Sequence, residues 1–189
     1  LLTDLYEGHR LYGVYKDKGL SDITKFIYSH SDLVTVTQRK FAERIKPYCT
    51  HTLAVIKNAV DYELPAWNMQ PTRAKKNYCR FGWAGGIHHE QDVKYFAGVP
   101  HMVNQRAGRE NIRWDFYGAP PPNTPEDDWQ IDVWKNYKSI IMRGFKGPPN
   151  FTINYALPAD RYGQFFTNMD AAIAPLEMNA FNDSKSEIK

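Results

Sequence analysis

Residues 80–92 read RFGWAGGIHHEQD, and the change of pattern inside this stretch decides the fold of the second half of the chain. An apolar run from Phe81 to Ala84 is typical of a buried strand, and it stops at Gly85 and Gly86. A helix-compatible acidic segment follows. Glycines let the backbone approach a ligand closely, and N–H groups at a helix start attract anions. The order predicts a site for a phosphorylated ligand, although Gly-Gly before a helix is more often a simple turn.

The part of the chain before residue 62 predicts two helices and then a strand–helix–strand unit. Apolar residues recur at helical spacing on both sides of Gly19, which predicts two short helices in residues 1–30. Residues 32–37 are β-branched and alternate in polarity, residues 38–48 return to helical spacing, and residues 53–56 are a short apolar run. We expect a βαβ unit here, with parallel strands.

From residue 78 onwards strands and helices alternate, which predicts a Rossmann-like parallel sheet covered by helices. Alternating or apolar runs predict strands at 112–116, 151–155 and 170–174; helical spacing predicts helices at 91–97, after Pro100, at 132–142 and at 158–167. Between residues 63 and 77 the periodicity is lost, and prolines and a basic cluster take over. We therefore expect domains at 1–62 and 78–189, joined by a linker at 63–77.

Composition excludes several classes of function. The formal charge of +3 comes from 24 scattered basic and 21 acidic residues, so we expect no nucleic acid partner. Cys49 and Cys79 lie far apart without a CxxC motif, which argues against a zinc knuckle or a disulfide scaffold and favours a reducing, cytoplasmic location. The sequence has no long apolar run and no signal peptide, so we expect a soluble protein without a transmembrane segment.

The last segment, DAAIAPLEMNAFNDSKSEIK at 170–189, predicts a second loop of the same kind. A short strand ends at Pro175, a polar loop follows, and Ser184 to Glu187 fits a capping box that would begin a helix with Lys185 in its first turn. Loops at the carboxyl ends of different parallel strands can converge on one crevice. Because the chain begins without methionine and ends where a helix has just begun, we expect it to be a fragment of a longer protein.

These residues resemble the retaining nucleotide-sugar glycosyltransferases of the GT-B fold. Many members carry G-W-A-G, a histidine four residues later and then an aspartate, and later D-x-x-x-A-P-L, F-N, K-S and a lysine. The matching positions here are Gly82 to Gly85, His89, Asp92, Asp170, Ala174 to Leu176, Phe181, Asn182, Lys185, Ser186 and Lys189. Ahead of the linker, residues 31–37 and 56–61 look like the last strands of the family's first domain. Each match alone is unspecific, but their order along nearly the whole chain is informative.

The resemblance implies a partial GT-B enzyme, with the end of the acceptor-side domain at 1–62 and a truncated donor domain at 78–189. It implies transfer of a sugar from a UDP- or GDP-linked donor to an acceptor with retention, with the nucleotide sugar as substrate and no cofactor or metal. Lys185 and His89 would be catalytic. The donor would be bound by Gly85, Gly86, Glu177, Phe181, Asn182, Ser184 and Ser186. The family's last carboxylate would fall beyond Lys189, and its usual basic residue after the glycine turn is replaced here by His88 and His89.

Simpler interpretations stand beside these roles. His89 would be a solvent-exposed residue at a helix start without the resemblance, Phe181 could equally fill a core, and Glu177 could be a surface charge that binds no ribose. The spacing of His88, Glu90 and Asp92 is not that of HExxH, which argues against a metal site. A non-catalytic nucleotide-binding or protein-interaction module is the main alternative function, and a nucleotide-sugar epimerase would need a GxGxxG motif that is absent. The sequence leaves homo-oligomerisation open.

Overall fold

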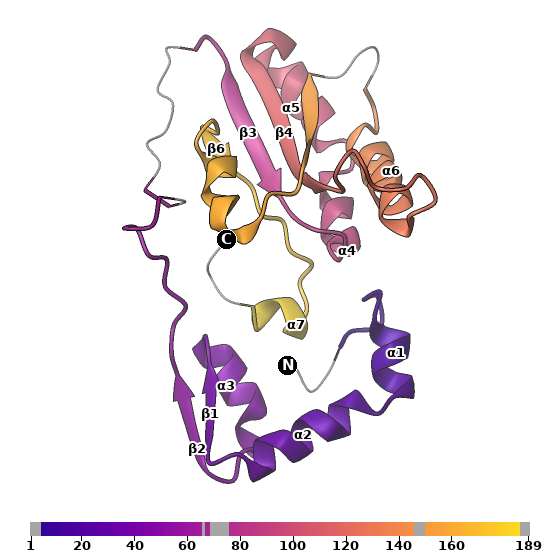
Figure 1. The fold of residues 1–189 in the computed structure, drawn as a ribbon. Coiled ribbons are helices and arrows are strands. Elements are labelled where there is room, and N and C mark those ends of the chain that lie inside the picture. Colours follow the sequence, from indigo (N-terminus) through magenta and orange to yellow (C-terminus); the bar gives the residue numbers. More distant parts are fainter. Residues whose placement is uncertain (1–4, 66, 69–75, 146–149, 186–189) are drawn as a thin grey trace. The chain divides into compact units, whose positions relative to one another are not determined.

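The computed structural model describes residues 5–65, 67–68, 76–145 and 150–185 (Figure 1). The chain divides into two compact units, the first made of Leu1–Ala59 with Glu177–Lys189 and the second of Val60–Leu176. The first limit lies close to the expected end of the first domain at residue 62. Residues 177–189, which we expected in the second domain, group with the first unit instead. The assignment of acceptor and donor roles to the domains stays a prediction.

The first unit contains the expected βαβ element. Strands β1 (Leu33–Val36) and β2 (Thr52–Val55) pair in parallel, with Val34 opposite Leu53, and α3 (Arg39–Ile45) with the short η1 (Lys46–Tyr48) connects them. The two helices predicted before it are α1 (Tyr12–Asp17) and α2 (Leu20–His30). Gly19 adopts a left-handed conformation at the start of α2, with φ of 60°, which suits a residue without a Cβ. Tyr28, Val34, Val36, Ala42 and Ile45 form the buried core.

The second unit is a four-stranded parallel sheet in the order β5-β4-β3-β6. The strands are β3 (Cys79–Ala84), β4 (Ile112–Ala119), β5 (Phe151–Tyr155) and β6 (Ala171–Ala172). The segments between them contain α4 (Glu90–Val93), η2 (Lys94–Phe96), α5 (Val99–Ala107), η3 (Arg109–Asn111), α6 (Trp129–Ile141) and η4 (Ala159–Phe166). The predicted α/β class with parallel sheets is confirmed.

One aromatic-rich core holds the second unit together. Helix α6 buries Val133, Trp134, Tyr137, Ile140 and Ile141, which recur at helical spacing and so form one apolar face. That face packs against the side chains of β3 and β4, where Trp83 is 1% exposed and Phe116 is 1% exposed. Asp128 caps α6, because its carboxylate accepts a hydrogen bond from the Gln130 N–H at 2.8 Å. This hydrogen bond fixes the start of α6 and the end of the segment that leads into it.

Three elements near the C-terminus differ from the sequence prediction. The strand expected at 170–174 is only two residues long, and the helix expected at 158–167 is the 3₁₀-helix η4. Helix α7 (Ala180–Asp183) begins four residues before Ser184, with Asn179 as its N-cap. Ser184 ends this helix, and its hydroxyl donates to the Ala180 carbonyl at 2.8 Å, so the prediction that Ser184 begins a helix is wrong. Ser186 and Glu187 lie outside the described residues.

Two further findings on the described residues concern membrane-spanning helices and metal sites. Among them, the helices are too short or too polar to span a bilayer. Over the same residues, His, Cys, Asp and Glu side chains do not gather in groups of three or more that could hold a metal ion.

Candidate functional site

The glycine turn follows the carboxyl end of β3, in the second unit. The Gly85 N–H donates to the Tyr117 carbonyl at 3.0 Å, which ties the turn to the neighbouring strand β4. A Cβ at Gly85 would overlap the ring of Trp83, and a Cβ at Gly118, where φ is +122°, would overlap the Gly85 carbonyl oxygen. Only glycine fits at these two places without a shift of their neighbours.

Gly86 differs from Gly85 in its surroundings. It is exposed, and a Cβ built on it would meet no heavy atom within 4 Å. Open space therefore lies over the backbone of this turn, at the carboxyl end of a buried parallel strand. In open α/β sheets this end of a strand is where ligands bind.

The rest of the turn is anchored to α6. The Tyr137 hydroxyl donates to the Ile87 carbonyl at 3.0 Å, and the Asn136 amide lies 3.5 Å from the Glu90 carboxylate. Tyr137 is fully buried, so its hydroxyl needs an acceptor, and Ile87 supplies one. A buried tyrosine on a long helix thus holds the loop that carries both glycines.

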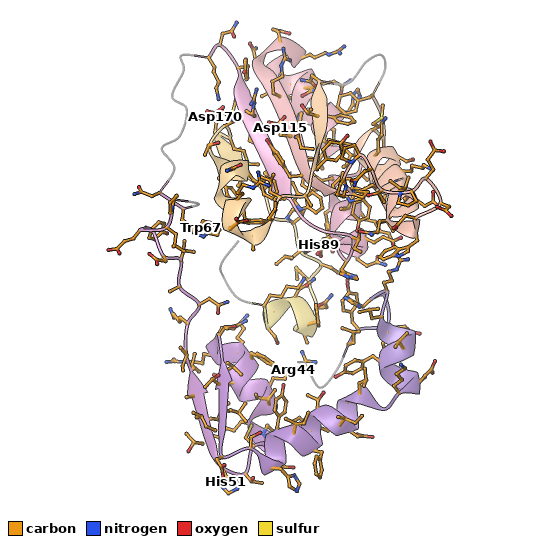
Figure 2. All side chains as sticks on the ribbon, in the orientation of Figure 1. Arg44, His51, Trp67, His89, Asp115 and Asp170 are labelled. Carbon is orange, nitrogen blue, oxygen red and sulfur yellow. The ribbon has the colours of Figure 1, made fainter. Side chains whose placement is uncertain are left out.

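His89 is the N-cap residue directly before α4 and is paired with an acid. Its Nδ1 lies 2.7 Å from Oδ2 of Asp92, one helical turn on, and the Asp92 side chain is 3% exposed. His89 is labelled in Figure 2. Since a carboxylate can only accept hydrogen bonds, Nδ1 carries the proton in this pair, and Nε2 is the ring nitrogen that can meet a ligand. The His89 ring also stands edge-on to Trp83, with 5.9 Å between centroids. His89 is therefore held in place, which the interpretation as a freely exposed residue did not anticipate.

Asp92 was absent from the site residues predicted above. Its role follows from the spacing of three between His89 and Asp92, because residues three apart on a helix face each other. Tyr137 was missed as well, and the sequence gives no local sign that its hydroxyl reaches a loop fifty residues away.

The second group of predicted residues lies in the first unit, around α7. Asn179 and Asn182 hold the segment: the Asn179 carboxamide oxygen accepts from the Asn182 N–H at 2.8 Å, and both side-chain amides donate to Glu177 at 2.9 Å. Gln38, just before α3, donates to the Lys185 carbonyl at 2.9 Å. The loop after Leu176 is thus ordered by its own asparagines and by a residue from the βαβ element.

Phe181 and Lys185 face a hollow in the first unit. Lys185 Nζ lies 5.1 Å from the centre of the Phe181 ring, and that ring contacts Tyr6 and His9. The hollow has a volume of about 530 Å³ and is lined mainly by apolar side chains of α1 and α2, with Phe41, Phe181, Ser184 and Lys185. Phe181 thus lines this hollow, and its part in binding a donor stays a prediction.

The structure thus forms two groups from the predicted site residues. Gly85, Gly86 and His89 lie together in the second unit, and Glu177, Phe181, Asn182, Ser184 and Lys185 lie together in the first. The two groups belong to different units, and the prediction that both meet one ligand stays a prediction. Ser186 falls outside the described residues.

Comparison with solved structures shows the fold. The chain is similar to a structure described as "OtsA apo structure", with a TM-score of 0.60 and 10% identity over 91% of this chain and 46% of the other. A second, described as "Trehalose-6-phosphate synthase. OtsA", gives a TM-score of 0.60 and 11% identity over the same shares. This likeness confirms the predicted GT-B type of fold. The chain spans about half the length of these structures.

The other two comparisons give no match. No protein-family model matches the chain, and no curated protein matches it by sequence. At 10% identity the structural likeness concerns the fold alone.

Proposed function

We propose that this chain is part of a glycosyltransferase that moves a sugar from a UDP- or GDP-linked donor to an acceptor with retention of configuration. The observation that carries the proposal is the open space over Gly86, at the carboxyl end of β3, in a chain with the GT-B type of fold. A diphosphate approaching there would meet backbone rather than side chains. Backbone N–H groups can stabilise the negative charge that grows on the departing phosphate.

Two side chains have the chemistry to assist. His89, with its Nδ1 proton directed to Asp92, offers Nε2 to a hydroxyl of the donor sugar or to a phosphate. Lys185 would neutralise the leaving diphosphate, and Phe181, Asn182, Ser184, Ser186 and Glu177 would bind the rest of the donor. A charge that grows only in the transition state is stabilised most effectively by groups already fixed in place, which fits the held position of His89.

Hydrogen exchange of the whole chain tests the proposal. UDP-glucose and GDP-mannose are the probes, and UMP and GMP, which lack the second phosphate, are the controls. We expect a nucleotide sugar to slow exchange at residues 85–89 and near Lys185, and the monophosphates to do so much less. Absence of protection at residues 85–89 by any nucleotide would contradict the proposal.

Two substitutions make the test specific. Gly86→Ala places a methyl group in the open space, so it should weaken donor binding while leaving the fold intact. Lys185→Gln should weaken binding by about tenfold, since a hydrogen bond to a charged group contributes roughly 1.5–3 kcal/mol. Lys25→Gln is the matched control, because Lys25 of α2 likewise lies over an aromatic ring, that of Tyr48 at 5.4 Å, and its carboxylate partner is Asp22. Equal effects of the two lysine substitutions would argue against a role for Lys185.

A non-catalytic nucleotide-binding module is the second candidate. The chain matches only 46% of the length of the two structures, and a part of an enzyme can bind a ligand without transferring anything. Release of free sugar or transfer to an acceptor would favour the enzyme. Tight binding with intact donor after long incubation would favour the module.

A further inference from the structure

The amino-terminal edge of the sheet in the second unit gathers positive charge around one aromatic ring. The Arg80 guanidinium carbon lies 5.6 Å from the centre of the Tyr78 ring, that of Arg113 lies 5.4 Å from it, and Lys76 Nζ lies 5.9 Å from it. Tyr78 directly precedes β3, and Arg80 and Arg113 are the second residues of β3 and β4, so this cluster lies at the opposite end of β3 from the glycine turn. It is separate from the candidate donor site.

Arg80 and Arg113 stand directly opposite each other in the sheet. They are paired in the register of β3 and β4, which puts two positive side chains side by side. Like charges in such a position destabilise a sheet, and the contacts of both arginines with the Tyr78 ring act against this repulsion. Residues that break a local rule of stability often mark functional sites.

The carboxylates near this edge do not neutralise Arg113. Asp115 is buried and lies 3.4 Å from Arg80 Nε, and it also accepts a hydrogen bond from the Thr152 hydroxyl at 3.0 Å. Asp170 accepts from the Arg80 backbone N–H at 2.7 Å (Figure 2). Within the described part of the chain, Arg113 forms no ion pair; its Nη1 donates to the Ile112 carbonyl at 3.3 Å.

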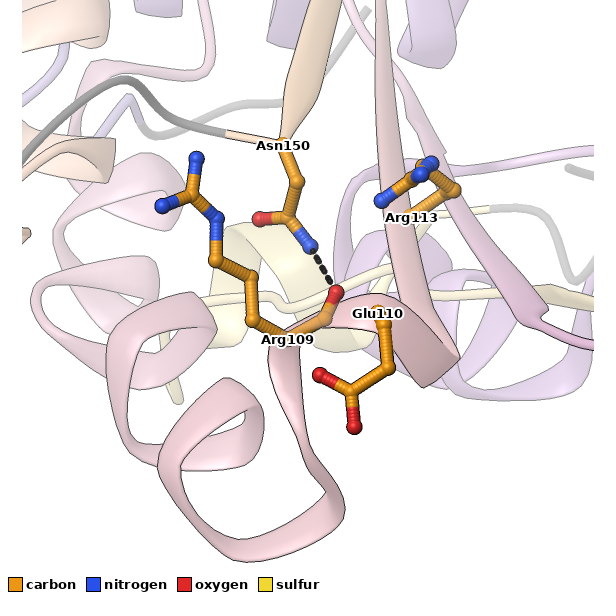
Figure 3. A pocket seen from close by; sticks show the side chains of 4 residues that line it. All are labelled: Arg109, Glu110, Arg113 and Asn150. Carbon is orange, nitrogen blue, oxygen red and sulfur yellow. Dashed lines mark hydrogen bonds between the residues drawn. The ribbon is translucent and has the colours of Figure 1, made fainter.

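A hollow of about 450 Å³ lies beside Arg113, lined by Arg109, Glu110, Arg113 and Asn150. Figure 3 shows the guanidinium groups of Arg109 and Arg113 on either side of Asn150, with the Glu110 carboxylate apart from both. The Glu110 side chain folds back over Gly108, where a Cβ would come within 2.5 Å of its Oε1. The guanidinium groups of Arg109 and Arg113 therefore face this hollow. The Glu110 carboxylate, which is the one acidic group among the lining residues, turns toward the backbone of Gly108.

The floor of the hollow is fixed by a chain of hydrogen bonds. The Asn150 amide donates to the Arg109 carbonyl at 3.0 Å and to the Ile112 carbonyl, and its oxygen accepts from Asn104 at 2.6 Å. Asn104 in turn accepts from the Trp114 indole N–H at 3.0 Å. These hydrogen bonds hold the backbone that carries Arg109 and Arg113, so ligand binding would cost less conformational entropy.

We propose that this strand-start hollow binds a phosphate-bearing small molecule. Guanidinium groups form paired hydrogen bonds with phosphate oxygens, and a bound anion would offset the repulsion between Arg80 and Arg113. A volume of about 450 Å³ suits a small ligand. The phosphate can come from a free metabolite or from a lipid headgroup, since both present the same charged oxygens.

Titration of the whole chain with inorganic phosphate and pyrophosphate tests this site by nuclear magnetic resonance. We expect shifts at residues 109–113 and at the Trp114 indole, and we expect Arg113→Gln to abolish them. A shift at Gly86 would report on the proposed donor site and should be the same in Arg113→Gln. Arg113→Gln should lower the affinity for pyrophosphate about tenfold and change the unfolding midpoint little, because it removes both a like-charge pair and a favourable contact with the Tyr78 ring. Arg109→Gln is a second variant at an exposed position. Arg106→Gln, on α5 and outside the lining, is the matched control.

Sedimentation with lipid vesicles distinguishes a free metabolite from a lipid headgroup as the source of the phosphate. Binding of pyrophosphate without sedimentation on phosphatidylglycerol vesicles would support a free small molecule. Sedimentation that pyrophosphate competes and that Arg113→Gln abolishes would support a lipid headgroup. No binding of either probe at millimolar concentration, or an equal loss in Arg106→Gln and Arg113→Gln, would overturn the proposal. Since Gly86 reports separately on the donor site, failure here leaves the proposed function standing.

Discussion

Gly85 and Gly86 are neighbours in the sequence, but a methyl group would have opposite consequences at the two positions. At Gly85 it would overlap the Trp83 ring, which is 1% exposed and has no room to move, and at Gly86 it would enter open space. We expect Gly85→Ala to lower the free energy of unfolding by about 1–3 kcal/mol. Gly86→Ala should change it by less than about 0.5 kcal/mol.

Urea unfolding followed by tryptophan fluorescence measures this difference. The two variants control each other, because they add the same methyl group at adjacent positions. If both lose the same stability, then the tight packing of Gly85 against Trp83 does not describe the molecule. If only Gly86→Ala loses nucleotide binding while keeping its stability, the open space is a binding feature.

At the scale of an element, helix α6 fixes the glycine turn through one hydroxyl. Tyr137→Phe removes the hydrogen bond to the Ile87 carbonyl but keeps the buried ring. We expect the free energy of unfolding to fall by about 0.5–1.5 kcal/mol and hydrogen exchange at residues 86–89 to become faster. Tyr95→Phe, at a residue that is 55% exposed, serves as the control. Unchanged exchange in the turn of Tyr137→Phe would show that other contacts hold it.

Tyr28 of helix α2 should make the first unit less stable at alkaline pH. Burial, followed by interactions with Tyr15 and Cys49, raises the pKa of Tyr28 to about 12 from its ordinary value of 10.0. The folded chain therefore keeps a proton that the unfolded chain loses first as the pH rises. The contribution is complete below pH 10.0 and is lost as the pH rises toward about 12.

Hydrogen exchange of the first unit as a function of pH, compared with Tyr28→Phe, measures this contribution. We expect the variant to lose stability less steeply than the original chain over that interval, because it has no phenol to ionise. Tyr62→Phe, at a residue that is 71% exposed, should follow the original chain. Parallel curves for all three proteins would contradict a raised pKa at Tyr28.

Elements with a strong local pattern were predictable from the sequence. The alternation in β1 and the apolar face of α6 indicate which side of each element is buried, and the structure shows that burial. Strand β4 also alternates in sequence, but it lies between β3 and β5 and buries Asp115 as well as Trp114 and Phe116. Helix α7 was misplaced because Asn179 and Ser184 are both good N-cap residues, so the local pattern offers two starts. Its end is also held by Gln38, which contacts Lys185 from 147 positions away, and no local pattern carries that contact.

The residues of the candidate sites also divide into those that a local sequence pattern predicts and those that it does not. Gly85, Gly86 and His89 could be found because strand, glycine and helix start follow one another along the chain. The basic edge could not, since Arg80 and Arg113 become neighbours only through the register of β3 and β4. Arg109 and Asn150 likewise meet through the Asn150 side chain, 41 positions apart.

At the scale of the whole molecule, the two units differ in how they are built from the chain. The second unit is one continuous stretch, Val60–Leu176, with its own core of tryptophan, phenylalanine and isoleucine side chains. The first unit combines two separate stretches and buries a smaller core, while Ile23, Phe26 and Ile27 of α2 are 51%, 61% and 47% exposed. Apolar burial is the main source of stability, so we expect the second unit to be the more stable one.

A chain restricted to residues 60–176 tests this expectation. It should fold by itself, unfold in one cooperative transition, and keep the Trp114 indole N–H resonance at the position it has in the whole chain, because the acceptor Asn104 belongs to the same unit. Removal of residues 177–189 alone should leave that resonance unchanged and speed hydrogen exchange in α3, since Gln38 loses the carbonyl groups that it binds. A poorly dispersed spectrum for residues 60–176 would mean that its core needs the first unit, and the division into independent units would then fail.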